Sequence, residues 1–341
     1  MSNYFFEKVN FSTLGEEFNA FPQKSVLTTR EWIEFISEDS KAVPYILRIS
    51  KDGKNIGYFS ALRCKKFGIP IIASPFPGWS TQYMGFDLFD ASLGNEILPE
   101  LVKYIFKTEA CYYLQINDRM LDASVVKELA KQNGWQFSQG ETLELGIDGD
   151  DAFLYKNMKT DCRNFVRQFE RRGATIEQAE PNDEFAVDYF EQLKDVFAKQ
   201  GLVPTYTVDK VKRLLRHLGP SGNILCLRVR DPEGKSIATS IFPAYNKRMF
   251  FWGGASYREY QHYRPNEYMI YTAMRYWRDR GCTEFDMVGN RAYKKKFGSW
   301  ESSYPCIIVT KYRVLLILKN IAAKLYYFLG KVLWKLKVSR T

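Results

Sequence analysis

The sequence predicts an α/β fold with a mixed sheet, built from two similar domains in tandem. Two hairpins support this prediction, because strand-like residues flank an acidic, glycine-containing turn at 46–57 and again at 225–238. After each hairpin, a helical segment leads into a strand that ends in an acidic residue and a turn. Chance similarity between two common hairpins is the alternative, but the matching helix and strand favour an internal duplication. The length of 341 residues is sufficient for two domains of ordinary size.

The predicted elements of the first half follow the order helix, hairpin, helix, strand, helix and strand. Thr28 or Thr29 caps the first helix, because its hydroxyl can accept from a free backbone amide of the first turn. Asp52-Gly53 forms the hairpin turn, and Gly134 ends the third helix. The elements span residues 29–37, 44–51, 55–64, 94–107, 111–116, 122–133 and 142–147.

The second half begins with a long predicted helix and then continues with strands and further helices. Asp231 and Gly234 lie in the turn of its hairpin, and Pro265 lies near the first turn of its last helix, which Gly281 ends. The predicted helices span residues 151–172, 183–200, 208–217 and 265–280. The predicted strands span residues 174–179, 224–230, 236–245, 248–255 and 283–288.

Cysteine and histidine are too scattered to indicate a metal site or a disulfide framework. The chain has six cysteines without a CxxC pair, and two histidines. Nucleophile-elbow, P-loop, Rossmann and HExxH motifs are also absent from the sequence. The N-terminus does not resemble a signal peptide, and no segment offers the ~20 apolar residues of a spanning helix. We therefore expect a cytoplasmic protein with reduced cysteines, no metal and no permanently bound cofactor.

Most of the net charge of +10 lies in the last part of the chain. Residues 311–341 include eight Lys or Arg and no Asp or Glu. Residues 313–337 contain no proline, and helical periodicity there separates lysines from a broad apolar face. The pattern predicts a basic amphipathic helix that lies on an anionic membrane surface. A terminal helix packed on the body and an RNA-binding tail are the alternatives.

The stretch 283–300 combines a strand, a Gly-Asn turn, four cations and two aromatic residues that follow them. Lysines beside aromatic rings can hold an anionic phosphate, whereas a solvated surface hairpin is the alternative. Residues 293–298 read aromatic-Lys-x-x-Phe-Gly, and residues 159–167 read Lys-x-x-x-Arg-Asn-x-x-Arg. Together with the hairpin at 231–238, these motifs resemble those of the FemAB-like transferases of the GNAT acyltransferase superfamily. The resemblance covers most of residues 150–310.

This resemblance implies two tandem GNAT-like domains, at 1–148 and 149–310, followed by the basic amphipathic tail helix at 311–341. The second domain would carry the site, and the first would be degenerate. Acyl transfer requires two substrates held in line and donors for the developing oxyanion, which a GNAT strand supplies from its backbone. An acyl-CoA or an aminoacyl-tRNA would be the co-substrate.

The first group of candidate site residues lies in the 283–300 stretch. Lys294 and Tyr293 match family positions that contact the acceptor, and Asn290 and Phe297 lie beside them. Asp286 could accept a proton from the acceptor amine or orient it. A buried aspartate that caps the following turn is an equally good interpretation of Asp286.

The second group lies on two predicted helices. Arg163 and Arg167 share one helix face, with Asn164 next to them, and could bind a phosphate or a polyanionic carrier. Pairing with nearby acidic residues is the alternative. Arg264 and Asn266 begin the helix whose amides would hold a coenzyme A pyrophosphate in a GNAT enzyme. The segment before that helix lacks the family's glycine-rich loop, which leaves the donor open.

Two functions of different class follow from these features. The first is a transferase, peripheral on the inner face of the cell membrane. It moves an acyl or aminoacyl group to an amine of a lipid-linked or glycan precursor of the cell envelope, and tRNA is a possible partner. The alternative is a non-catalytic membrane-surface binding protein on a degenerate GNAT scaffold. Loss of function in an Asp286→Asn, Lys294→Ala variant that still folds and binds membranes would support the enzyme.

Overall fold

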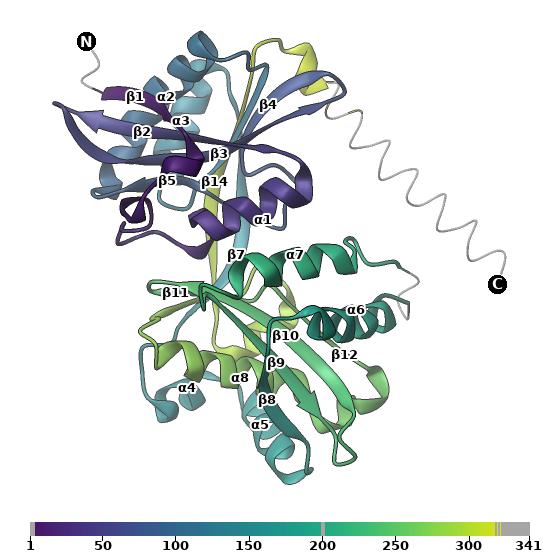
Figure 1. Cartoon of the computed structure of the whole chain (residues 1–341). Coiled ribbons are helices and arrows are strands. Elements are labelled where there is room, and N and C mark those ends of the chain that lie inside the picture. The colour runs from purple at the N-terminus through teal and green to yellow at the C-terminus, as the bar shows by residue number, and fades with distance from the viewer. Residues whose placement is uncertain (1–3, 199–201, 318, 320, 322–341) are drawn as a thin grey trace.

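The computed structural model describes residues 4–198, 202–317, 319 and 321, which form two α/β halves joined by one sheet (Figure 1). The predicted α/β fold is confirmed, because parallel and antiparallel pairs occur in the same sheet. The first half contains β1 (Tyr4–Val9), α1 (Arg30–Ser40), β2 (Val43–Lys51), β3 (Lys54–Lys66), β4 (Ile69–Ser74), β5 (Gly85–Leu88), α2 (Gly94–Thr108), β6 (Tyr113–Asn117), α3 (Ala123–Asn133) and β7 (Gln136–Gly146).

The second half is longer in helix and ends on a long strand. It contains α4 (Asp151–Asn157), α5 (Thr160–Arg171), β8 (Thr175–Ala179), α6 (Asp183–Ala198), α7 (Val208–Leu218), β9 (Ile224–Arg230), β10 (Ser236–Tyr245), β11 (Arg248–Phe250), β12 (Gly253–Ser256), α8 (Pro265–Arg278), β13 (Glu284–Asp286) and β14 (Trp300–Thr310). Short 3-10 helices lie at η1 (Phe11–Thr13), η2 (Glu16–Phe18), η3 (Val26–Thr28), η4 (Ala91–Leu93), η5 (Arg258–Tyr263) and η6 (Ala292–Phe297).

The two halves exchange their last strands. The strand order is β1-β2-β3-β4-β6-β14-β7-β13-β11-β10-β9-β8, with β5 beside β3 and β12 beside β10. Strand β7 ends the first half but pairs with β13, and β14 ends the second half but pairs with β6. The two exchanged strands also pair with each other, so they cross the junction together (Figure 1). This exchange makes the junction between the halves part of the sheet.

A hydrophobic core also runs across this junction. Trp32 and Tyr83 of the first half and Tyr189 and Phe250 of the second half are buried in one cluster. Each half has a further core of its own on the other face of its sheet. Since apolar burial stabilises by about 25 cal/mol per Å², this shared core holds the halves in a fixed arrangement.

The predicted single helix at 151–172 is wrong, because the chain forms α4 and α5 with an extended break at Met158. The Arg163 guanidinium donates to the carbonyl of Met158 at 3.1 Å, which caps the end of α4. The amide of Lys159 donates to the carbonyl of Lys296 at 2.8 Å. The second contact is long-range, so it lies outside the local sequence pattern, which by itself favours a continuous helix.

The predicted tail helix lies mostly outside the described residues. Within them, the chain is helical at 314–317, 319 and 321, and the prediction for 322–341 lies outside the described residues. None of the helices in the described part of the chain has both the length and the apolar character needed to cross a bilayer.

Candidate functional site

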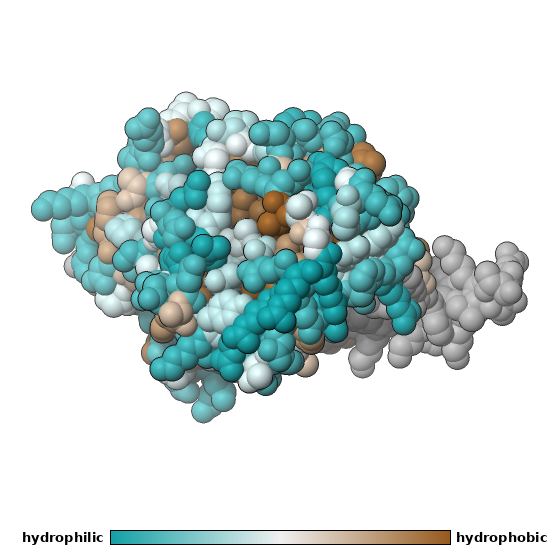
Figure 2. Space-filling model, turned by 90° about the horizontal axis from the view of Figure 1, so that it is seen from below, coloured by the Kyte–Doolittle hydropathy of each residue, from teal (hydrophilic) through white to brown (hydrophobic). Residues whose placement is uncertain are grey.

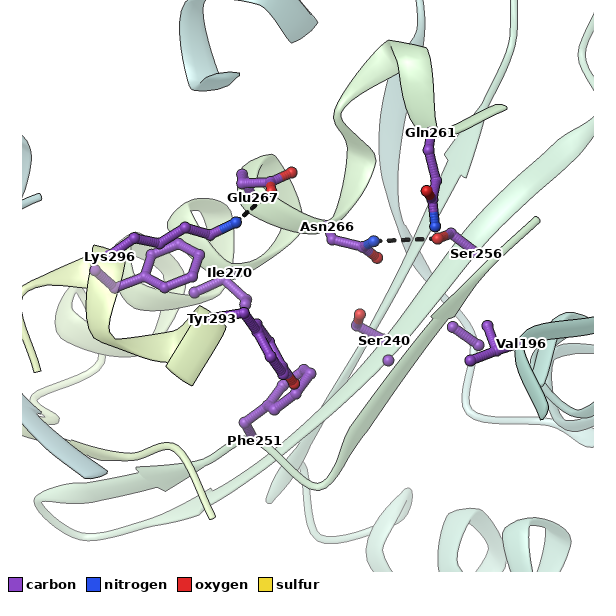
Figure 3. A pocket seen from close by; sticks show the side chains of 13 residues that line it. Val196, Ser240, Phe251, Ser256, Gln261, Asn266, Glu267, Ile270, Tyr293 and Lys296 are labelled. Carbon is purple, nitrogen blue, oxygen red and sulfur yellow. Dashed lines mark hydrogen bonds and ion pairs between the residues drawn. The ribbon is translucent and has the colours of Figure 1, made fainter. Parts of the chain in front are cut away.

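The sheet of the second half splits, and a cavity of about 260 Å³ occupies the split (Figure 3). Strand β13 runs parallel to β11 as far as Phe250, whereas β12 pairs only with β10 among the strands that the structure describes. The cavity is lined by β10, β12, the first turn of α8 and η6. Seen from below, the molecule is largely hydrophilic, and hydrophobic residues show in a hollow near the centre of this face (Figure 2).

The open edge of β12 offers backbone donors to this cavity. The amide of Tyr257 donates to the carbonyl of Ile237 at 3.1 Å, which fixes the hydrogen-bonding phase of the β10–β12 pair. Because antiparallel strands alternate the direction of their amides, the N–H groups of Gly254 and Ser256 point away from β10. Both residues line the cavity. A Cβ at Gly254 would lie 2.5 Å from Ser240 Oγ, so only glycine fits there without displacing a neighbour.

Polar side chains line the helix side of the cavity. Asn266 Nδ2 donates to Ser256 Oγ at 3.1 Å, which ties the start of α8 to β12 (Figure 3). Lys296 Nζ lies 2.5 Å from Glu267 Oε1, and both side chains are less than one-fifth exposed. The first turn of α8 also leaves backbone amides without helical partners. This side can therefore bind polar or anionic groups.

Helix η6 supplies the aromatic side of the cavity. Tyr293 lines it and is 53% exposed, whereas Phe297 lines it from a buried position. Gly298 follows with a φ of +88°, and a Cβ there would lie 2.4 Å from the carbonyl oxygen of Asn157. The predicted residues Tyr293, Phe297 and Asn266 are thus brought together around one cavity.

Lys294 lies behind this aromatic wall and holds the preceding turn. Its Nζ donates to the carbonyls of Met287 at 2.6 Å and Val288 at 2.5 Å. Burial lowers the pKa of Lys294 to about 8, and the nearby Asp286 carboxylate partly opposes this shift. Lys294 does not line the 260 Å³ cavity.

Asp286 is fully buried and joins the two halves. Its carboxylate accepts from Tyr83 Oη at 2.8 Å, from Thr142 Oγ1 at 2.5 Å and from the amide of Val288 at 2.8 Å. Burial raises the pKa of Asp286, whereas these three hydrogen bonds lower it. The carboxylate is therefore placed to fix the turn after β13, and it has no exposed surface for a substrate.

The other predicted residues lie away from the cavity. Arg163 donates to carbonyls at the end of α4, and Asn164 and Arg167 are exposed on α5. The Arg264 guanidinium lies 4.2 Å from the centroid of a phenylalanine ring of α5. Asn290 Nδ2 donates to a glutamate of β7 at 3.3 Å. These side chains belong to the surface or to local packing around α5 and β7.

A second cavity, of about 400 Å³, lies between the two halves. Its lining includes Trp32 and Gly78 of the first half and Tyr206, Lys210 and Trp252 of the second half. Lys210 Nζ donates to the carbonyl of Gly78 at 3.1 Å. The buried Trp252 Nε1 has no hydrogen-bond partner among the described residues.

The two cavities are neighbours, because consecutive residues between β11 and β12 face them in turn. Phe251 lines the 260 Å³ cavity, and Phe250 and Trp252 line the 400 Å³ cavity. Sequence reasoning missed Ser240, Ser256 and Lys296, which carry much of the polar lining. The sequence does contain a sign that α2 and α8 correspond to each other. Asn95-Glu96 and Asn266-Glu267 begin these helices, and a cysteine follows each pair at the same spacing.

Comparisons with known proteins agree with this arrangement. Residues 156–295 match the family described as an acetyltransferase (GNAT) domain. A lipid II:glycine glycyltransferase of Staphylococcus saprophyticus is 30% identical, over 83% of this chain and 84% of that protein. The structure of FemX has a TM-score of 0.75 at 17% identity and covers 92% of this chain and 99% of FemX. A tandem GNAT protein from the clavulanic acid biosynthesis pathway has a TM-score of 0.51 at 8% identity, over 90% of this chain and 98% of that one.

Proposed function

Since this chain belongs to the FemAB-like family of GNAT acyltransferases, we propose that it transfers an aminoacyl group from a charged tRNA to an amine of a lipid-linked peptidoglycan precursor. The protein is a transferase, and the choice of substrates is the proposal. The observation that carries it is the relationship to the lipid II:glycine glycyltransferase, which covers 83% of the chain and so extends into both halves.

The 260 Å³ cavity is the proposed place of the aminoacyl ester. The acceptor amine attacks the ester carbonyl carbon, the new C–N bond forms and the C–O bond of the ester breaks. The amine loses a proton, and the ribose oxygen leaves as a hydroxyl. The amides of Gly254 and Ser256 would stabilise the oxyanion of the tetrahedral intermediate, and such donors are worth about 10²–10³ in rate each.

Two observations favour a charged tRNA over an acyl-CoA as the donor. The segment before α8 is the compact helix η5, followed by Arg264 in the left-handed conformation, rather than a glycine-rich loop. Arg167, Arg171 and Arg172 are exposed on and after α5, and such clustered arginines bind a phosphate backbone. The match to an acetyltransferase domain favours acyl-CoA as the second candidate donor.

The 400 Å³ cavity between the halves is the proposed place of the acceptor. Trp252 and Val288 form part of its lining. Lys294 and Asp286 would act as positioning residues, because they hold the 286–289 turn between the two cavities. Tyr293 would contact the substrate from the donor side. A lipid-linked acceptor also places the enzyme at the inner face of the membrane, where the basic segment 311–341 would contact anionic lipid.

A transfer assay with the full-length protein tests the proposal. The protein is incubated with lipid II in detergent and with either tRNA charged with a labelled amino acid or labelled acetyl-CoA. We expect label to move from the charged tRNA to lipid II. Transfer only from acetyl-CoA would favour the acyl-CoA donor, and transfer from neither would contradict the proposal. Ligand-induced thermal stabilisation by each donor gives an independent measure of binding.

A further inference from the structure

The turn between β3 and β4 carries an aromatic residue where the backbone favours a small one. Phe67 and Gly68 have φ values of +51° and +78°. Positive φ at both central residues is typical of a type I′ turn, which favours Asn, Asp or Gly and in which a bulky residue is strained. The β2–β3 turn, at the other end of β3, has Asp52 and Gly53 with φ values of +51° and +76°. One end of β3 thus has the favoured residues, and the other has a phenylalanine.

Phe67 does not pack on the described part of the chain, because its side chain is 100% exposed. Lys65 and Lys66 precede it at the end of β3, and both are exposed. The neighbouring carboxylate of Glu109 is 13% exposed and pairs with Arg63 at 3.3 Å. The tip of the hairpin is therefore a protruding aromatic side chain with cations beside it. Packing against residues 4–198 or 202–317 does not explain why a phenylalanine occupies this strained position.

The start of the C-terminal segment leaves the sheet at the same place. Tyr112 connects the two features: its amide donates to the carbonyl of Pro70 in β4 at 3.0 Å, and its carbonyl accepts from the amide of Lys311 at 3.0 Å. The rings of Tyr112 and Tyr312 meet edge to face, with centroids 5.9 Å apart. Figure 1 shows this segment beside the β3–β4 hairpin at the end of the first half.

Residues 311–317 resemble the hairpin tip, because they also combine exposed cations with exposed apolar side chains. Lys311 and Arg313 are exposed, and the side chains of Tyr312, Val314 and Ile317 are each more than half exposed. We propose that residues 65–68 and 311–317 form one docking surface for an anionic lipid bilayer. The inference deepens the proposed function, because a lipid-linked acceptor is presented at such a surface.

The chemistry of this docking surface favours lipid over nucleic acid. Lysines are attracted to anionic headgroups, and aromatic and aliphatic side chains enter the boundary between headgroups and acyl chains. Single-stranded RNA stacks on aromatic rings and binds cations, but these interactions do not involve exposed aliphatic residues such as Val314 and Ile317. A bilayer accepts both kinds of apolar side chain.

Binding of the full-length protein to vesicles tests this surface. Phe67→Asn removes the ring and supplies a residue that the type I′ turn favours, so folding is preserved or improved. Lys65→Glu with Lys66→Glu reverses the adjacent charge. We expect phosphatidylcholine vesicles that contain phosphatidylglycerol to sediment the unaltered protein. We expect the vesicle partition coefficient to fall several-fold for Phe67→Asn and about tenfold or more for the double charge reversal.

A matched control uses the opposite end of β3. Lys51→Glu with Lys54→Glu changes the net charge equally but lies at the other hairpin, and it should bind vesicles nearly as well as the unaltered protein. Equal loss in both double variants would contradict a local docking surface. Failure of the unaltered protein to bind vesicles, or binding to tRNA with the same dependence on Phe67, would also overturn the inference. Aminoacyl transfer to a soluble stem-peptide acceptor should be unchanged by Phe67→Asn, which separates this inference from the proposed reaction.

Discussion

The two halves contain strands and a helix in the same order, but among the residues that the structure describes the second half has a cavity where its sheet splits and the first does not. The pairing of β3 with β5 and of β10 with β12 places Phe86 and Leu88 of the first half where the second half has Gly254 and Ser256. In the first half, the space beside these residues is too small for a water molecule. A Cβ on Gly94 would already lie 2.9 Å from Leu121 Cδ2. Apolar side chains therefore close the first cleft.

The segments that follow β6 in the first half and β13 in the second half also differ. In the first half, β6 leads to Leu121 and the helix α3, whereas in the second half β13 leads to the short η6 with Tyr293 and Lys294. The pairing of β4 with β6 and of β11 with β13 also places Gln115 at the position of Asp286. The cleft of the first half is thus filled by apolar side chains, whereas the cleft of the second half is lined by small residues. The difference supports a single active site in the second half.

The largest expected effect on activity comes from filling the cleft of the second half with an apolar side chain, as in the first half. Ser256→Leu introduces the residue found at the corresponding position of the first half, and its side chain would fill the cavity beside the free β12 amides. We expect aminoacyl transfer to fall about 10³-fold, because the carbonyl can no longer reach its donors. The transfer assay measures this change, and circular dichroism verifies the fold. Unchanged activity would place the reaction outside this cavity.

The opposite change, opening the first cleft, should affect stability instead. Leu121→Ala removes a buried side chain from the closed site. We expect the free energy of unfolding to fall by about 2–5 kcal/mol, because the packed surroundings relax only partly into the space. Denaturant unfolding measures this value, and transfer activity at low temperature should stay within about twofold. A large loss of activity without loss of stability would show that the closed cleft of the first half also takes part in the reaction.

Much of this fold could be predicted from the sequence, because local patterns determine it. The two hairpins and the helix after Pro265 have clear turn and capping residues. Strand β14 was not predicted, since its polar start and Pro305 do not resemble a strand that lies between two others. Its position depends on the exchange of strands between the halves, which is a long-range property.

The candidate site was predictable only in part, for a similar reason. Tyr293, Phe297 and Asn266 were found because the family motif or the start of α8 marks them. Ser240 and Ser256 were missed, because a serine in a strand carries no local signal of the cavity it faces. Their contribution depends on the divergence of β12 from β13, which only the pairing of the strands reveals.

A smaller effect is expected for the lysine that the first half lacks. Lys294→Met leaves the carbonyls of Met287 and Val288 without their buried donor, so we expect about a tenfold loss of transfer activity. The charged amine of Lys294 donates stronger hydrogen bonds than the neutral amine does, and its pKa lies at about 8. Activity of the unaltered enzyme should therefore fall as pH rises through about 8. A pH–rate profile measures this limb, and the limb should disappear in Lys294→Met.

The stability of the folded enzyme should show the same titration with the opposite sign. The pKa of Lys294 is about 8 in the folded state and 10.5 for an unperturbed lysine. Between these values the unfolded chain binds more protons, so the contribution of Lys294 to the free energy of unfolding rises with pH. Comparison of the unaltered protein with Lys294→Met isolates this contribution. An activity limb at pH 8 that survives in Lys294→Met would belong to another group.

The smallest effect should distinguish the asparagine at the start of α2 from the asparagine at the start of α8. Asn266 donates to Ser256 Oγ at 3.1 Å in the open cleft, whereas Asn95 accepts from the amide of Asp122 at 3.1 Å. We expect Asn266→Ala to reduce transfer a few-fold, because β12 loses its tie to α8. Asn95→Ala should cost about 0.5–1.5 kcal/mol of stability and leave transfer unchanged. Equal effects on activity would mean that the asparagine serves the fold of the unit in both halves, and that the open cleft alone distinguishes the second.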